Sequence, residues 1–328
     1  MKGSETMKRR CMLLLFFILL LPLSCLGEET PIYEAIARME FHMRPEVGST
    51  RWGEKVDAGA TVQVYEYGDQ WCRIAGGEQG WCQTEWLWGF RSLDALNYSV
   101  PGAIMNQGAV QLAQDTWIQG GKFKGVMAQK GTIVCISERT DESYLLPIWR
   151  GEGSIPLMNG DLVGFDIWEE AVPGQLLGGF TTFYGDQLGK GMAKERAYNI
   201  ALGCQRIHGT ILEPGERFSF NALCAPYKKE NGYLMAPNIS RDGKGYGGGV
   251  CQVTTTLYNA LLGLPLQIEE WAVHRFAGID YAPQFFDAAV GSYTDLAFIN
   301  TLPYSIRISA LDQEGVVTVL IYREGEGI

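Results

Sequence analysis

Hydrophobic and polar residues follow different periods in different parts of the chain, and these periods predict the elements. Between residues 31 and 95, apolar and polar positions alternate in short runs such as 61–67 and 71–74, with Gly-rich turns between the runs. A period of two is typical of β-strands that bury one face. Short strands at this spacing predict a small all-β barrel.

Residues 96–172 continue with runs rich in β-branched and aromatic residues, such as 131–137 and 161–166, between turn-forming residues. We therefore expect a second β-rich region here. The composition changes after the pair Pro173-Gly174, which predicts a boundary at that point.

From residue 173 to residue 328 the patterns are mixed. Apolar residues recur at helical spacing over 193–207, and again directly after the three glycines 247–249. Alternating runs that predict strands follow at 285–290, 296–300, 305–310 and 316–322. Helices packed on an antiparallel sheet would make this part an α+β domain, so the chain as a whole is predicted to be multidomain.

The first 27 residues resemble an export signal, because a basic segment at 8–10 precedes a run of Leu, Phe and Ile at 12–21. The run is shorter than the about 20 apolar residues of a membrane span. We expect a signal peptide over 1–27 and an exported protein, extracellular or associated with the cell wall. The alternatives are a lipid anchor on Cys25 or an uncleaved signal, which would be its only contacts with the membrane.

Composition restricts the partners. The 328 residues are 46% hydrophobic, enough to fill more than one core, and the formal charge of -10 argues against a nucleic-acid partner. Six of the 8 cysteines lie beyond the signal, none in a CxxC pair, so neither a metal nor a cofactor is expected. If disulfides form, we expect Cys72 with Cys82 and Cys204 with Cys224.

Several short motifs in residues 31–95 resemble bacterial SH3-like domains. They are Met43-Arg44-Pro45, Gly59-Ala60-Thr61, Trp71-Cys72-Arg73-Ile74 and Gly80-Trp81-Cys82. The resemblance implies a module that binds cell-wall peptides or holds a secreted enzyme on the wall. The alternative is a spacer domain without a ligand, because a fold does not fix a function.

A second resemblance covers about 150 residues of the C-terminal region. Its motifs are Gly178-Gly179-Phe180-Thr181-Thr182, Arg196 with Asn199-Ile200, Pro214 to Asn221, Gly247 to Val253, Thr255 to Asn259, Asp287-Ala288-Ala289-Val290, Asp295-Leu296, and Phe298 with Asn300. They resemble VanW-like proteins in kind and in order. The family is named after an accessory protein of vancomycin-resistance clusters, and this name alone implies a role in glycopeptide resistance. The resemblance implies export but no settled activity.

The glycine-cysteine stretch carries the candidate chemistry. Cys251 is expected in the first turn of a helix, where unpaired N–H groups and the helix dipole favour a thiolate. His274 is the candidate base, and Asp287 or Asp295 the candidate acid that orients it. This order is similar to that of papain-like and NlpC-type peptidases. The alternative is a packed cysteine beside a structural histidine.

Other residues complete the candidate site. Gln252, or the backbone amides of Gly247, Gly248 and Gly249, are candidates for stabilising an oxyanion. Arg275 is a candidate for binding a substrate carboxylate, and it could equally be a solvated charge. Tyr258, from the motif that follows Cys251, is the remaining predicted binding residue.

Two hypotheses follow for this exported cell-envelope protein. In the first, it is a cysteine-dependent hydrolase or transpeptidase of peptidoglycan that is held on the wall by the SH3-like module. In the second, it is a non-catalytic protein that binds cell-wall peptides or acts as a scaffold. The separation of the Cys251 and His274 side chains distinguishes them, because a general base must reach its nucleophile.

Overall fold

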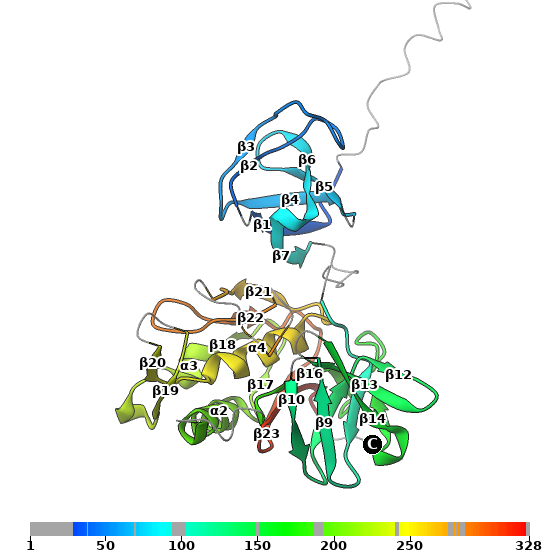
Figure 1. Ribbon diagram of the computed structural model, residues 1–328, viewed down its shortest axis with the longest axis vertical. Coiled ribbons are helices and arrows are strands. Elements are labelled where there is room, and N and C mark those ends of the chain that lie inside the picture. Colours follow the sequence, from blue (N-terminus) through cyan, green and yellow to red (C-terminus); the bar gives the residue numbers. More distant parts are fainter. Residues whose placement is uncertain are drawn as a thin grey trace, which may run out of the picture. The chain divides into compact units, whose positions relative to one another are not determined.

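A computed structural model describes most of the chain after the export signal. The described residues are 29–37, 39–68, 70–93, 103–121, 123–148, 151–185, 193–239, 243–274, 279, 281–282 and 286–325. The predicted signal peptide and Arg275 lie outside them. The chain is β-rich, with few helices, and it divides into two compact units, 1–87 and 88–328 (Figure 1).

The first unit contains an antiparallel sheet and a separate hairpin. The sheet has the order β6-β5-β4-β1-β7 and the hairpin pairs β2 with β3. The strands are β1 (Tyr33–Ala37), β2 (Phe41–His42), β3 (Lys55–Val56), β4 (Thr61–Glu66), β5 (Trp71–Ala75), β6 (Gln79–Gln83) and β7 (Leu87–Ser92), and the 3-10 helix η1 (Thr84–Trp86) precedes β7. Only the first residue of β7 falls within 1–87. Burial alternates along β4, β5 and β6, as the period of two predicts.

Among the described residues of this unit, the strands do not close into a barrel, and the predicted SH3-like barrel is not confirmed. The edge strands β6 and β7 lie at opposite ends of the sheet order, and the short β2–β3 hairpin forms its own sheet. One isolated bridge, between Arg44 and Trp81, connects the hairpin region with β6. The sheet therefore stays open, because its two end strands, β6 and β7, do not pair with each other.

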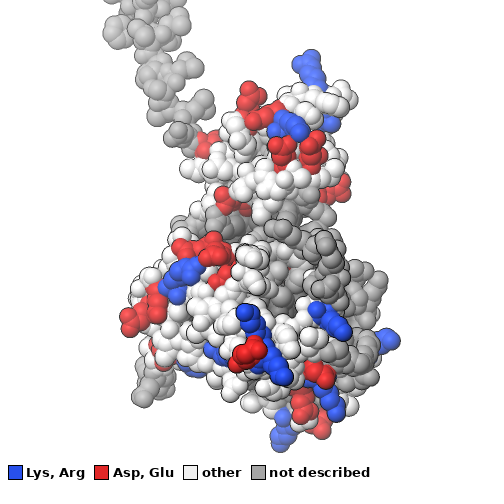
Figure 2. Space-filling model, turned by 90° about the vertical axis from the view of Figure 1, so that its left-hand side faces the viewer, with Lys and Arg blue, Asp and Glu red and all other residues white. Residues whose placement is uncertain are grey.

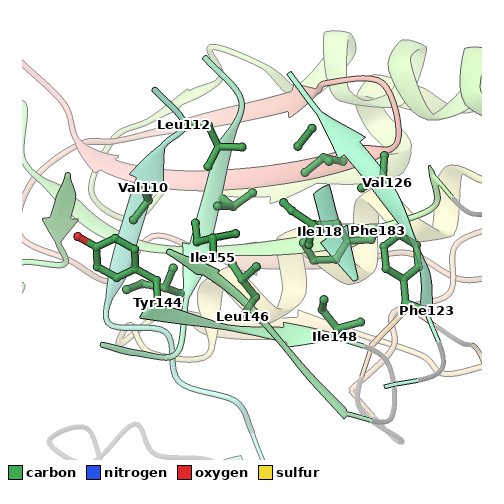
Figure 3. Close-up of a cluster of buried hydrophobic side chains, with 14 residues drawn as sticks. Val110, Leu112, Ile118, Phe123, Val126, Tyr144, Leu146, Ile148, Ile155 and Phe183 are labelled. Atoms are coloured by element: carbon green, nitrogen blue, oxygen red, sulfur yellow. The ribbon is translucent and has the colours of Figure 1, made fainter. Parts of the chain in front are cut away.

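The second unit begins with two sheets built from residues 108–164. Their orders are β10-β9-β14-β13-β12 and β11-β8-β15. The elements are β8 (Gly108–Gln111), β9 (Thr116–Gly120), β10 (Phe123–Ala128), β11 (Ile133–Ile136), β12 (Glu138–Arg139), β13 (Ser143–Ile148), β14 (Gly151–Pro156), η2 (Leu157–Asn159) and β15 (Leu162–Gly164). Figure 3 shows the core that they enclose, in which Ile118, Leu146 and Ile155 are fully buried.

A four-stranded sheet with the order β16-β24-β23-β17 continues the unit. It consists of β16 (Leu176–Phe183), β17 (Ile211–Leu212), β23 (Ile306–Asp312) and β24 (Val316–Arg323). Phe183 and Val316 from this sheet belong to the same buried cluster as the side chains of residues 108–164. The regions predicted as 96–172 and 173–328 thus share a core inside one compact unit.

The four-stranded sheet is covered on both faces, which explains why every residue of β16 is buried. A Cβ on Gly178 would lie 3.0 Å from the carbonyl of Ala260 in helix α4 (Val250–Leu261). A Cβ on the next residue, Gly179, would lie 3.0 Å from Sγ of Cys135 in β11. Neighbouring strand residues point to opposite faces, so helix and β-region sandwich the sheet.

Helix α2 (Ala193–Ile207) packs beside α4 and against β23, as the helical spacing over 193–207 predicts (Figure 1). The remaining elements are β18 (Arg217–Ser219), α3 (Phe220–Cys224), η4 (Lys229–Asn231), β19 (Met235–Pro237), β20 (Lys244–Tyr246), β21 (Gln267–Glu270) and β22 (Ala297–Ile299). No described helix is long and apolar enough to cross a bilayer. On the face shown in Figure 2, acidic and basic side chains are interspersed.

Candidate functional site

Cys251 is the second residue of α4, in the first turn as predicted. The preceding residue but one, Gly249, has φ 106°, in the left-handed region that favours glycine. A Cβ at Gly249 would lie 3.0 Å from Cγ of Arg196 on α2, so the two helices approach each other closely here. Cys251 is partly exposed, whereas the other five cysteines of the described chain are buried. Among the described cysteines, only Cys251, at the start of α4, therefore has a thiol that solvent or a substrate can reach.

An extended segment, 286–290, lies along α4 and is held by hydroxyl and amide side chains of the helix. Thr254 donates from Oγ1 to the carbonyl of Ala288 at 2.6 Å, and the amide of Ala288 donates to Oγ1 of Thr255 at 3.0 Å. Nδ2 of Asn259 donates to the carbonyl of Phe286 at 2.7 Å. These bonds occupy the backbone groups that a strand would use, so the strand predicted over 285–290 does not form among the described residues.

The segment in turn holds the chain that carries His274. The amide of Ala289 donates to the carbonyl of Ala272 at 2.7 Å, and Nε1 of Trp271 donates to the carbonyl of Asp287 at 2.9 Å. The Trp271 ring stacks on Tyr258 of α4, with ring centres 5.1 Å apart. Tyr258 itself is buried, so its place is in the packing behind the site.

Asp287 fixes both the backbone and the ring of His274. Its Oδ2 accepts a hydrogen bond from the backbone N–H of His274 at 2.8 Å and lies 2.6 Å from ring Nδ1. The two side chains are only 10% and 9% exposed. A carboxylate held this closely determines which ring nitrogen carries a proton and how the ring is turned.

Cys251 lies close enough to His274 to raise the pKa of the imidazole. Burial by itself lowers the pKa of His274, but the hydrogen bond to Asp287, the interaction with Cys251 and the charges of these groups outweigh burial and raise the pKa to about 9. On its other side, Sγ of Cys251 lies 3.6 Å from the carbonyl of Val290, to which it donates. The structure thus brings Cys251, His274 and Asp287 together in one row.

Comparison with known proteins bears on this region. Residues 195–322 match the family model described as VanW like protein. This part of the chain is a VanW-like domain. Over 151 residues the chain is 32% identical to "Uncharacterized protein YoaR" from Bacillus subtilis (strain 168), which covers 45% of this chain and 48% of that protein. The chain therefore spans about half the length of this curated relative. No solved structure matches the chain.

The two candidate acids of the VanW-like domain have different places. Asp287 contacts His274, whereas Asp295 accepts hydrogen bonds from Oγ of Ser219 at 2.5 Å and from the backbone N–H of Asn221 at 2.9 Å. These residues begin helix α3, so Asp295 holds the start of that helix. The sequence left open which aspartate contacts His274, and in the structure Asp287 does so while Asp295 holds the start of α3.

The predicted oxyanion donors of the VanW-like domain are largely engaged elsewhere. Gln252 is fully buried, with Oε1 accepting from Arg196 and Nε2 donating to Thr182 at 3.1 Å. The amides of Gly247 and Gly248 donate to the carbonyls of Leu234 and Gly245, respectively. The amide of Cys251 itself stands in the first turn, where an α-helix supplies no acceptor, which makes it the better donor.

Sequence reasoning missed four residues that shape this site. Thr254, Thr255 and Asn259 have the helical spacing of a polar stripe, and that stripe was the available signal. Tyr281 was given no role, although its burial and the charges of Cys251 and Asp287 raise the pKa of its hydroxyl. No group of three or more His, Cys, Asp or Glu side chains within the described residues is arranged to hold a metal.

The two predicted disulfide pairs are free thiols in the structure. Cys72 and Cys82 lie directly opposite each other on β5 and β6, and both are fully buried. The hydrogen bond of 3.3 Å between Sγ of Cys72 and Oγ1 of Thr84 shows one sulfur engaged with a hydroxyl instead.

Proposed function

We propose that the VanW-like domain is a cysteine-dependent acyl-transfer enzyme, in which Cys251 is the nucleophile, His274 its acid and base, and Asp287 the residue that orients His274. The hydrogen bond between Asp287 and His274, together with the effect of the nearby Cys251 on the same imidazole, carries the proposal. With its pKa raised to about 9, the imidazole of His274 holds a proton at neutral pH, which it can give to a leaving group.

The chemistry follows from these positions. The thiolate attacks a peptide carbonyl, and the N–H of Cys251 at the helix start is placed to stabilise the oxyanion. His274 gives its proton to the amine that leaves, and a thioester on Cys251 remains. Water or a second amine then attacks the thioester and releases the acyl group, so the same site serves a hydrolase or a transpeptidase.

Peptidoglycan is the proposed substrate. The expected export signal places the protein at the cell envelope, where short peptides of the wall offer both the acyl group and the accepting amine. We propose further that residues 31–95 are an SH3-like module that binds the wall, beside the α+β arrangement proposed for residues 173–328. Trp52 supports this: it is 72% exposed, its ring stacks on His42 at 4.9 Å, and Arg44 lies over it.

The test compares wild type and Cys251→Ala on purified muropeptides, with products separated by chromatography and identified by mass. We expect hydrolysed or cross-linked products from the wild type and none from the variant. Mass spectrometry of the quenched wild type should also show an acyl adduct on the peptide that contains Cys251. Identical product profiles would remove the thiol mechanism. Binding of muropeptides without any product would favour the scaffold hypothesis.

A further inference from the structure

Arg196 is a positively charged residue beside the nucleophile that sequence reasoning gave no role. It stands in the first turn of α2, partly buried, and its Nη2 donates to Oε1 of Gln252 at 2.8 Å. Its guanidinium carbon lies 6.0 Å from the ring centre of Tyr281. Gln252 directly follows Cys251, so Arg196 packs against the helix start that carries the thiol.

The guanidinium of Arg196 has fewer hydrogen-bond acceptors than a partly buried arginine side chain normally has. Among the described residues, no carboxylate forms an ion pair with Arg196, and its Nε is buried without an acceptor. An arginine side chain has five N–H donors and keeps its charge at any relevant pH, so removing it from water is costly unless it is paired.

Arg206, ten residues further along α2, shows the contrast. Its guanidinium donates to the carbonyls of Cys224 and Asn231 and to the hydroxyl of Tyr233. The helix therefore carries one arginine that is satisfied by the fold and one, Arg196, that is not. The arginine with an unpaired Nε is the one that lies at the start of α4, next to Gln252 and Gly249.

The electrostatic environment at this end of α4 favours an anion. The N-terminus of a helix carries about half a positive charge, and the charge of Arg196 adds to it. Two charges act on the hydroxyl of Tyr281: the charge of Cys251 raises its pKa, and the charge of Arg196 lowers it. An anionic group of a bound substrate would meet a matching, largely desolvated partner here.

We propose that Arg196 binds a carboxylate of the acyl donor and so places the neighbouring carbonyl at Cys251. The inference rests on the proposed acyl-transfer function and adds to it a requirement for a negatively charged substrate. A wall peptide has two sources of this chemistry, the free C-terminal carboxylate and the carboxylate of an internal side chain. Both offer the two oxygens that a guanidinium binds.

The test uses three synthetic stem peptides: one with all carboxylates free, one with a C-terminal carboxamide, and one with an amidated internal carboxylate. Wild-type kcat/KM should fall about ten- to hundredfold for the peptide that lacks the bound carboxylate, since a charge-assisted hydrogen bond is lost. Which amide causes the fall identifies the carboxylate. Equal rates for all three peptides would overturn the inference with no variant needed.

Arg196→Gln should bring the carboxylate-to-amide ratio of kcat/KM close to one, and Arg196→Lys should retain part of the preference. Lys194→Gln is the matched control, because it removes an exposed charge from the same helix turn. An unchanged ratio in Arg196→Gln would overturn the inference. Calorimetric binding of the same peptides to Cys251→Ala gives the ratio without turnover. If Cys251→Ala loses turnover while Arg196→Gln keeps the wild-type carboxylate-to-amide ratio of kcat/KM, the proposed function stands and only this inference is removed.

Discussion

One oxygen of Asp287 holds His274 twice, through the backbone N–H at 2.8 Å and through ring Nδ1 at 2.6 Å. The main chain and the imidazole are thereby fixed by the same carboxylate. Because Nδ1 faces Asp287, the second ring nitrogen, Nε2, remains for Cys251. Asp287 thus fixes the position of His274 and also helps to raise the pKa of its ring.

Replacing Asp287 with Asn should lower turnover by about 10²- to 10⁴-fold, because an amide neither carries the charge nor selects the same tautomer. The control is Asp295→Asn, whose carboxylate caps α3 and does not contact His274. That variant should lose about 1 kcal/mol of folding stability and keep its pH profile. Steady-state kinetics and thermal unfolding of both variants check this. Equal losses of turnover would contradict the assignment.

The protonation of His274 should appear in stability as a function of pH. Its pKa of about 9 in the folded protein lies above its usual value of 6.5, so protonated His274 stabilises the fold fully below about pH 6.5. This contribution, on the order of 3 kcal/mol, is lost as the pH rises through 9. Urea unfolding of wild type and His274→Gln at pH 6, 8 and 10 should show the difference in unfolding free energy shrinking. A constant difference would argue against a charged His274.

Cys251 should be the one cysteine that a small alkylating reagent modifies in the folded protein lacking residues 1–27. The other five are buried, and burial raises the pKa of Cys135 and Cys224 to about 12. Iodoacetamide labelling at pH 7.5 followed by peptide mapping measures this. Cys251→Ala should then remain unlabelled until denaturant is added. Comparable labelling of Cys72 or Cys82 in the native state would contradict the burial.

Thr254 should matter for catalysis although it touches no reacting atom. Thr254→Val removes the hydroxyl that donates to Ala288 and should cost about 1–3 kcal/mol, because a buried carbonyl loses its main partner. Thr254→Ser keeps the hydroxyl and serves as the control. We expect kcat to fall in the valine variant, because Ala288 loses this hydrogen bond and Asp287, the residue before it, is held less firmly. The serine variant should keep the wild-type kcat. Unfolding and kinetics on both variants distinguish a loss of position from a loss of fold.

Local features of the chain were predictable. The helix over 193–207, the helix start at Cys251 and most of the strands follow from spacing and turn residues, because these act over a few neighbouring positions. The VanW-like resemblance also rests on local motifs, and residues 195–322 match that family. The SH3-like barrel predicted for residues 31–95 is not confirmed, because closure of a sheet depends on which edge strands meet, a property that no single run encodes.

By itself, the sequence determined most of the helices and strands, the resemblance of the C-terminal region to VanW-like proteins, and a short list of candidate reactive side chains. Only the tertiary structure decided that Asp287, and not Asp295, contacts His274, and that Gln252 is buried between Arg196 and Thr182. It also showed that Nε of Arg196, beside the start of α4, has no hydrogen-bond acceptor and that no carboxylate among the described residues pairs with this side chain. The reason is physical. Periodicity reports how neighbours share a face, whereas a hydrogen bond between distant residues depends on how α4 packs against the segments around it.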